Sequence, residues 1–248
     1  MGSTTYIAKC LRRVCALLKV ATLRREKFPC RTSDHNKLDF STLLSEAQHR
    51  LYKNLVGMAD SEVQIGRFDI CYALIYVNIC FLAPREGHLT WLVNIFGYLQ
   101  NVHGKRKSIA VFTEDIGEIS GEGANTKDWL DKYPVATEDI DEVLPEYWGY
   151  PLSTAVYFDS DHAHDQVTRQ LVFGDLSFVG YTPISWTSKR QGTIESFSYS
   201  AEFLADTVSS EEVIALRYML RSLGVPIRSD TALCSDNLGM IISCTNPY

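Results

Sequence analysis

The sequence has no hydrophobic run long enough to cross a membrane. A spanning helix needs about 20 consecutive apolar residues. The N-terminal segment of residues 1–20 is interrupted by Lys9, Arg12, Arg13 and Lys19, so we expect neither a signal peptide nor an anchor there. We therefore expect no membrane partner.

The seven cysteines are odd in number and never stand in C-x-x-C spacing. Zinc sites and disulfide frameworks both need paired cysteines, so neither is expected. This usage is typical of reduced thiols in an intracellular protein. A loop with EF-hand spacing is also missing, which leaves a calcium role without support.

Charge is unevenly distributed along the chain. Residues 114–146 hold eleven Asp or Glu against two Lys, a net charge of −9, while the chain of 248 residues carries −6 in total, so the remainder sums to +3. Glycines and prolines punctuate the acidic stretch, which predicts a linker over residues 106–152. An acidic total therefore does not argue against nucleic-acid binding by the rest of the chain.

The residues before this linker predict a helical section, residues 1–105. Apolar residues recur at helical spacing over residues 7–20, 43–59 and 88–102. Residues 69–83 are nearly all apolar, which predicts a helix buried on most sides. We expect Ser41 or Thr42 to cap the second helix and Asp69 to cap the third.

A basic stretch lies at the start of this section. Residues 9–31 hold eight Lys or Arg, among them Arg12, Arg13, Arg24 and Arg25, against the single Glu26. Clustered positive charge suits the phosphates of a nucleic acid. An ordinary solvated helix face fits the same pattern.

The residues after the linker, 153–248, change to strand patterns. Residues 155–158, 171–179 and 182–187 are β-rich, and their close spacing predicts an antiparallel meander. A helical period follows over about residues 198–223, stopped by Gly224 and Pro226. Residues 231–234 predict a further strand, giving an α/β (α+β) fold with a mixed sheet and one long helix.

Four ordered motifs in this region resemble the ribonuclease H domain of copia-type retrotransposon polyproteins. They are FDSD at residues 158–161, TPISWTSKRQ at 182–191, AEF at 201–203 and SDNLG at 235–239. The earlier motifs YKNLVG at 52–57, GRFDI at 66–70 and APREGHLTWLVNIFGYL at 83–99 resemble the thumb and connection region of the same polyproteins. No part of the chain matches the polymerase palm, so we expect no polymerase activity.

The resemblance implies that Asp159, Glu202 and Asp236 hold two Mg²⁺ ions, with Mn²⁺ as a substitute. Two such ions, about 3.5–4 Å apart, activate water and stabilise a leaving oxyanion in phosphodiester cleavage. Shared ions require the carboxylates to converge within roughly 4–8 Å, and crowding should raise at least one of their pKa values. Taken singly, each residue also fits a structural role: a turn, an N-cap or an acid early in a helix.

Neighbouring residues are weaker candidates. Asp161 lies one step further along the strand than Asp159. His162 and His164 are expected to be surface or loop residues, since the motif accounts for them without a metal. Lys189 and Arg190, in a basic turn after the meander, are expected to contact phosphates.

The resemblance implies an RNA–DNA hybrid as substrate and the remainder of the Pol polyprotein as partner, in the cytoplasm, a virus-like particle or the nucleus. The family continues past the position of Tyr248 through a basic segment and a last acidic residue. We therefore expect an incomplete ribonuclease H domain with impaired cleavage, which an extended chain would regain. Two alternatives stay open: a non-catalytic nucleic-acid-binding fragment and an inactive retroelement remnant.

Overall fold

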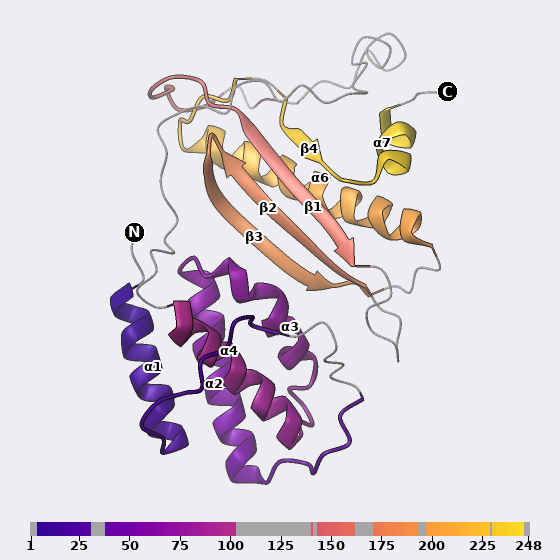
Figure 1. Ribbon diagram of the computed structural model, residues 1–248. Helices are drawn as coiled ribbons and strands as arrows, with labels where there is room; N and C mark the ends of the chain where they lie inside the picture. The colour runs from indigo at the N-terminus through magenta and orange to yellow at the C-terminus, as the bar shows by residue number, and fades with distance from the viewer. Residues whose placement is uncertain are drawn as a thin grey trace. The chain divides into compact units, whose positions relative to one another are not determined.

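The computed structural model describes residues 4–30, 38–102, 140, 143–161, 171–192, 197–228 and 230–245. The chain divides into two compact units, a helical one containing the N-terminal helices and a second one containing the sheet (Figure 1). The predicted mixed α/β architecture, with N-terminal helices followed by a mixed sheet and a long helix, is confirmed. Most of the predicted linker lies outside the described residues, so its boundaries stay a prediction.

The helical unit contains four α-helices and one 3-10 turn in its described part. The buried residues Ile7, Cys10, Leu11 and Val14 recur at helical spacing on the first helix, which is the pattern of a single core-facing stripe. The elements are α1 (Thr4–Leu18), α2 (Glu46–Gln64), η2 (Phe68–Ile70), α3 (Cys71–Ile79) and α4 (Glu86–Val102).

The helix caps differ from those expected. Ser45, not Ser41 or Thr42, caps α2: the backbone N–H of Gln48 donates to Ser45 Oγ, and the Gln48 side chain accepts from the N–H of Ser45. This reciprocal pair follows the S-x-x-Q capping box. The hydroxyl of Ser41 instead accepts from the N–H of Gly87 at 2.9 Å, at the start of α4.

Asp69 is not a cap either. The third helix begins at Cys71, and its N-cap residue makes no side-chain cap hydrogen bond. Asp69 accepts hydrogen bonds from Arg67 at 2.8 and 2.7 Å and from the Tyr98 hydroxyl at 2.8 Å. Because the Arg67 side chain is only 2% exposed, a carboxylate partner offsets the cost of burying its charge.

The second unit is built on a four-stranded sheet of order β3-β2-β1-β4. Its strands are β1 (Thr154–Asp161), β2 (Val172–Val179), β3 (Thr182–Arg190) and β4 (Ala232–Cys234). Strand β1 pairs antiparallel with β2 and parallel with β4. The pairing expected for residues 155–158 is therefore confirmed on both sides.

The turn between β2 and β3 is short because Gly180, at φ 54°, takes a conformation that costs glycine little. Strand β3 continues to Arg190, further than expected. Lys189 and Arg190 therefore end a strand rather than forming a turn. Both side chains are exposed.

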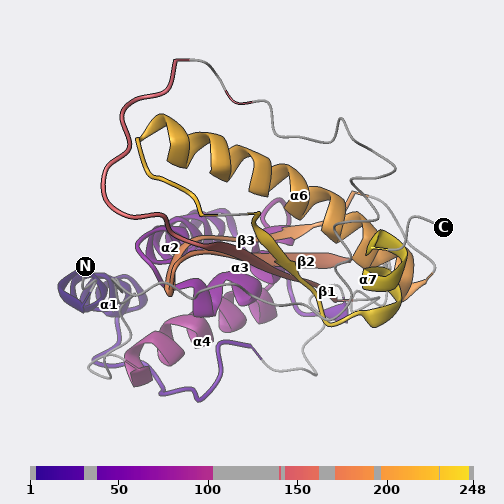
Figure 2. The ribbon, with the colours of Figure 1, turned by 90° about the horizontal axis from the view of Figure 1, so that it is seen from above.

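The long helix α6 (Ser198–Ser222) covers one face of the sheet, and α7 (Leu238–Thr245) follows β4 (Figure 2). Phe158 of β1, Phe173 of β2, Ala205 of α6 and Met240 of α7 form a buried cluster between them. This cluster fixes the start of α6 and the segment after β4 against the carboxyl-terminal half of β1. Among the described residues, no helix is both long and apolar enough to cross a membrane.

One acidic residue of β2 is buried. Asp175 is 6% exposed, and its Oδ2 has no hydrogen-bond partner in the part of the chain that the structure describes. Burial, with repulsion from Glu212 of α6, raises the pKa of Asp175 to about 6, although the backbone of Thr187 partly stabilises the carboxylate. At neutral pH the fold therefore tolerates a poorly solvated charge.

We predict that Ser45→Ala lowers the free energy of unfolding by about 1 kcal/mol, because the backbone N–H of Gln48 loses its acceptor, Ser45 Oγ. Thr42→Ala is the matched control and should change it by less than about 0.5 kcal/mol. Urea unfolding followed by circular dichroism measures both. Equal losses in the two variants would show that the cap had been wrongly placed.

We predict that Asp175→Asn stabilises the protein at pH 7 by an amount on the order of 2 kcal/mol. Because the folded pKa of about 6 exceeds the ordinary value of 3.8, stability present below pH 3.8 is lost as pH rises towards 6. The gain should therefore shrink towards pH 4 in urea titrations. A pH-independent difference would contradict this account; Glu212→Gln, which removes only the repulsion, should give a smaller gain.

Candidate metal centre

The first acidic side chain of the candidate centre belongs to the central strand. Asp159 is the third residue from the end of β1 and lies opposite Gly174 of β2 in the antiparallel register. Its side chain is exposed. Its pairing with β2 places Asp159 within the strand, so it does not form a turn.

The second acidic side chain comes from the start of the long helix. Glu202 is the fifth residue of α6 and is 6% exposed. Its neighbour Ala201 is fully buried against the sheet, and the buried side chain of Gln191 donates to the carbonyl of Ala201 at 3.5 Å. These contacts hold the first turns of α6 beside the end of β3 and point Glu202 inward.

The third acidic side chain follows β4. Asp236 lies two residues beyond this strand, which runs parallel to β1. Asn237, not Asp236, caps α7, since the N–H of Met240 donates to Asn237 Oδ1 at 3.0 Å. Because the cap is supplied by its neighbour, the carboxylate of Asp236 is available to the acidic cluster.

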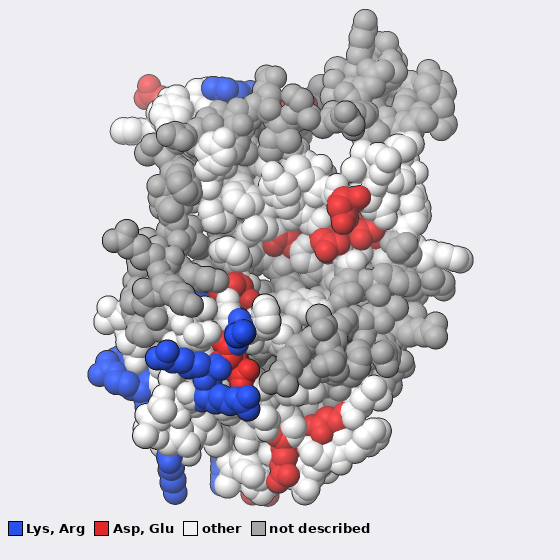
Figure 3. All heavy atoms as spheres, in the orientation of Figure 1, with Lys and Arg blue, Asp and Glu red and all other residues white. Residues whose placement is uncertain are grey.

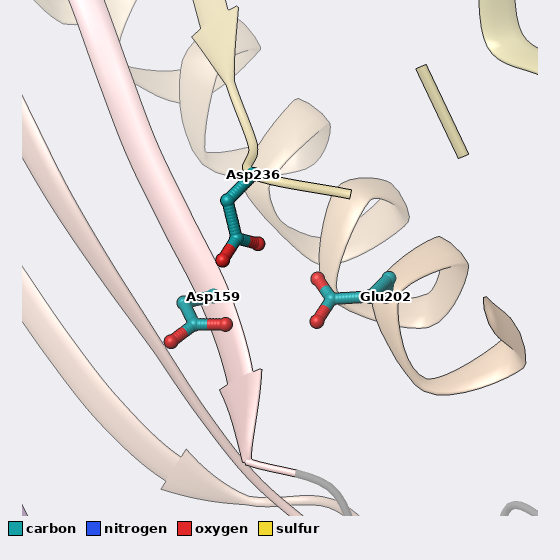
Figure 4. A group of neighbouring side chains, drawn as sticks. All are labelled: Asp159, Glu202 and Asp236. Carbon is teal, nitrogen blue, oxygen red and sulfur yellow. The ribbon is translucent and has the colours of Figure 1, made fainter. Parts of the chain in front are cut away.

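The three carboxylates converge. One ligand oxygen each from Asp159, Glu202 and Asp236 lies within 4.8 Å of the others. Figure 4 shows the side chains, from β1, α6 and the segment after β4, directed towards one shared space. The convergence predicted from the sequence is confirmed, although whether the residues hold metal remains a prediction.

The electrostatics of the cluster centre on Glu202. Burial raises the pKa of Glu202; contacts with Ser160 partly offset this shift, and the charges of Asp159 and Asp236 add to it. The predicted rise is confirmed in direction, but burial contributes more than the crowding on which it was based. Within the described residues, the buried Oε2 of Glu202 has no hydrogen-bond partner.

This arrangement fits a hard divalent cation. A buried carboxylate oxygen without a partner is costly, and a cation would compensate it. The donor set consists only of carboxylate oxygens, which suits Mg²⁺ or Mn²⁺ and not a metal that needs thiolate or imidazole. All seven cysteines are free thiols, and the described residues contain no other group of three metal-competent side chains.

The predicted nucleic-acid-binding residues are exposed and come from separate segments of the chain. Arg12 and Arg13 lie on α1, and Arg24 and Arg25 follow it. Figure 3 shows Lys and Arg side chains gathered over the helical unit. Arg24 pairs with Glu26 at 3.3 Å while its own side chain is 84% exposed, and such a pair contributes little to stability. Binding by these residues, and by Lys189 and Arg190, stays a prediction.

Some candidates cannot be placed, and others were missed. His162, His164 and the side chain of Asp161 lie outside the described residues. Sequence reasoning missed Asn237 as the cap that frees Asp236, although Asn is a favoured N-cap residue. It also missed Ser160, which contacts Glu202, although strand alternation places it on the opposite face of β1 from Asp159.

These observations define a cluster of carboxylates that could hold a metal ion on a mixed α/β fold.

Comparison with known proteins finds a partial similarity. Over 99 residues, 40% of this chain, the sequence is 31% identical to the "Retrovirus-related Pol polyprotein from transposon RE1" and equally to that from transposon RE2, both of Arabidopsis thaliana. The match spans 7% of the length of each polyprotein.

No protein-family model and no solved structure matches the chain. The comparisons thus support a distant, partial similarity to copia-type retrotransposon Pol polyproteins. The assignment to particular regions of those polyproteins stays a prediction.

We predict that Mg²⁺ stabilises the protein and that Asp159→Asn or Asp236→Asn abolishes this effect. At ten times the dissociation constant, one bound ion adds about 1.4 kcal/mol to the free energy of unfolding. Thermal melts with and without Mg²⁺ measure the gain. Glu211→Gln, an exposed acid on α6, is the control that should keep it; a Mg²⁺ effect of the same size in all variants would exclude the cluster as the binding site.

Without metal, Glu202→Gln should stabilise the protein at pH 7, since it removes a buried, repelled charge. The raised pKa of Glu202 means that stability present below its ordinary pKa of 4.5 is lost as pH rises through its folded-state pKa. The difference between variant and wild type should therefore close near pH 4. Melting in EDTA across pH 4–8 tests this, and destabilisation by Glu202→Gln at pH 7 would refute it.

Proposed function

We propose that residues 153–248 form a ribonuclease H-type endonuclease unit from a copia-type retrotransposon polyprotein. Its substrate would be the RNA strand of an RNA–DNA hybrid, and its cofactor Mg²⁺, with Mn²⁺ as a substitute. The observation that carries this proposal is the convergence of Asp159, Glu202 and Asp236 within 4.8 Å. The partial similarity to Pol polyproteins supports it, and the helical unit would correspond to their thumb and connection region.

The three carboxylates have different tasks in this proposal. Two divalent ions, when bound, supply activation of a water and charge stabilisation at the leaving oxygen. Asp159 and Asp236 are exposed, so they can hold ions on the side from which a phosphodiester approaches. Glu202 is buried and oriented by α6, so it would provide a fixed ligand from the protein side of the ions. The sheet and helix thereby hold the acids in place before substrate arrives, which reduces the cost of ordering them.

Two features support weak rather than efficient cleavage. The cluster found among the described residues has three carboxylates to share between two ions. The pKa of Glu202 is raised, so a proton competes with the metal for this ligand more strongly than usual. We therefore expect Mg²⁺ to be needed at high concentration and activity to increase with pH until Glu202 is ionised.

The alternative function is nucleic-acid binding without hydrolysis, favoured by the exposed arginines of the helical unit. Its signature would be binding whose salt dependence weakens in an Arg12→Ala, Arg13→Ala variant, with no metal-dependent product. An inactive remnant would show neither binding nor cleavage.

We predict slow, Mg²⁺-dependent cleavage of the RNA strand of an end-labelled hybrid, reduced at least about a hundredfold by Asp159→Asn. Single-turnover assays with excess protein measure this most sensitively. Glu211→Gln should retain the wild-type rate. Equal cleavage by wild type and Asp159→Asn, or none at saturating Mg²⁺ or Mn²⁺, would count against the nuclease and in favour of an alternative.

A further inference from the structure

A serine hydroxyl is buried next to the acidic cluster. Side chains of β1 alternate between the two faces of the sheet: Tyr157 and Asp159 are exposed, whereas Phe158 and Ser160 are 5% and 7% exposed. Phe158 packs in one cluster with Ala205 of α6, so Ser160 faces the same helix. Burying an unpaired hydroxyl is unfavourable, so this position calls for a polar partner.

The neighbours of Ser160 on the sheet are mostly apolar. In the antiparallel register Ser160 lies opposite Phe173 of β2, which belongs to the buried apolar cluster. Strand β4 pairs with β1 only as far as Tyr157, so it does not extend alongside Ser160. The polar neighbour is found above the sheet, in the first turns of α6, where Glu202 lies about one turn before Ala205.

Glu202 is the partner of Ser160. Both the hydroxyl and the backbone N–H of Ser160 lie close enough to the Glu202 carboxylate to stabilise its charge. The contact is irregular, since neither Ser160 Oγ nor Glu202 Oε2 completes a hydrogen bond of regular geometry among the described residues. Ser160 therefore acts on this carboxylate from the side of the sheet.

The side chain of Glu202 needs such a contact if it is to present its oxygens at a fixed place. The side chain of Gln191 holds the helix backbone, through the hydrogen bond of 3.5 Å to the carbonyl of Ala201. It leaves the several rotatable bonds of the Glu202 side chain unrestrained. Carboxylates that bind metals are commonly oriented by hydrogen bonds from an outer layer of residues, and Ser160 occupies such a position.

We propose that Ser160 is a positioning residue that orients Glu202 towards the ions held by Asp159 and Asp236. This inference rests on the proposed metal-dependent function. Ser160 contacts neither metal nor substrate in this account and acts only through Glu202. Loss of its hydroxyl should therefore weaken ion binding although all three carboxylates remain.

Three single variants of the full chain test this role. Ser160→Ala removes the hydroxyl, whereas Ser160→Thr keeps it in a residue type that strands accept well. Ser209→Ala is the matched control, because Ser209 is 0% exposed and its Oγ also has no hydrogen-bond partner in the described part of the chain. It lies about 10.5 Å beyond Glu202 along α6. Thermal melts in EDTA check that each variant is folded.

Mn²⁺ alone is the first probe, and its binding is measured from the electron paramagnetic resonance signal of the free ion. Ser160→Ala should raise the half-saturating concentration roughly tenfold, since loss of such an outer partner typically costs ten- to a hundredfold in metal affinity or activity. Ser160→Thr and Ser209→Ala should stay within about threefold of the wild type. In single-turnover cleavage, Ser160→Ala should need more Mg²⁺ but approach the wild-type rate at saturation.

The outcomes separate this inference from the proposed nuclease. Binding that Asp159→Asn abolishes and Ser160→Ala leaves unchanged would overturn the positioning role and leave the metal centre standing. A tenfold loss in Ser160→Ala, with no cleavage by the wild type, would support the positioning role while the nuclease fails. A wild-type chain that binds no Mn²⁺ would overturn both.

A general disturbance of the core gives a different pattern. An equal loss in Ser209→Ala, or in folded Ser160→Thr, would overturn the positioning role in favour of such a disturbance. If the added methyl group of Ser160→Thr prevents folding, the comparison of Ser160→Ala with Ser209→Ala decides by itself.

Discussion

The parallel pairing of β1 with β4 is the constraint on which the candidate site depends. It pairs Cys234, the last residue of β4, with Tyr157 of β1. Asp236 and Asp159 each follow two residues later, so they approach one another although 77 positions separate them. Helix α6 then packs over the sheet through Ala205, Phe158 and Phe173 and brings Glu202 to the same place. Three elements distant in sequence thus hold like charges together, against their mutual repulsion.

Such an arrangement is unfavourable for the isolated fold. Glu202 is almost fully buried, and its Oε2 lacks a partner among the described residues. A protein interior normally satisfies such a group or replaces it with an apolar one. Retaining it beside two exposed aspartates is consistent with a site built for a cation, and the proposed nuclease gives that cation a purpose.

Much of this could be predicted from the sequence, for identifiable reasons. The β-rich runs, the helical period and the breakers Gly224 and Pro226 located the sheet and α6, because these signals are local. The acids were found because motifs surround them.

The errors came from residues with several possible partners. Asp69 looked like a cap, but its partners Arg67 and Tyr98 are brought to it by tertiary packing. Ser41 and Thr42 were preferred to Ser45 as caps of α2. The burial of Glu202 shifts its pKa more than its acidic neighbours do, and this burial could not be predicted from the sequence.

The central claim is that the three carboxylates hold divalent metal, and anomalous diffraction from crystals soaked in Mn²⁺ tests it most directly. The account predicts anomalous density between Asp159, Glu202 and Asp236, with two peaks about 3.5–4 Å apart at full occupancy. Asp159→Asn crystals should lose at least one peak. Density elsewhere, or none between these side chains at saturating Mn²⁺, would contradict the account.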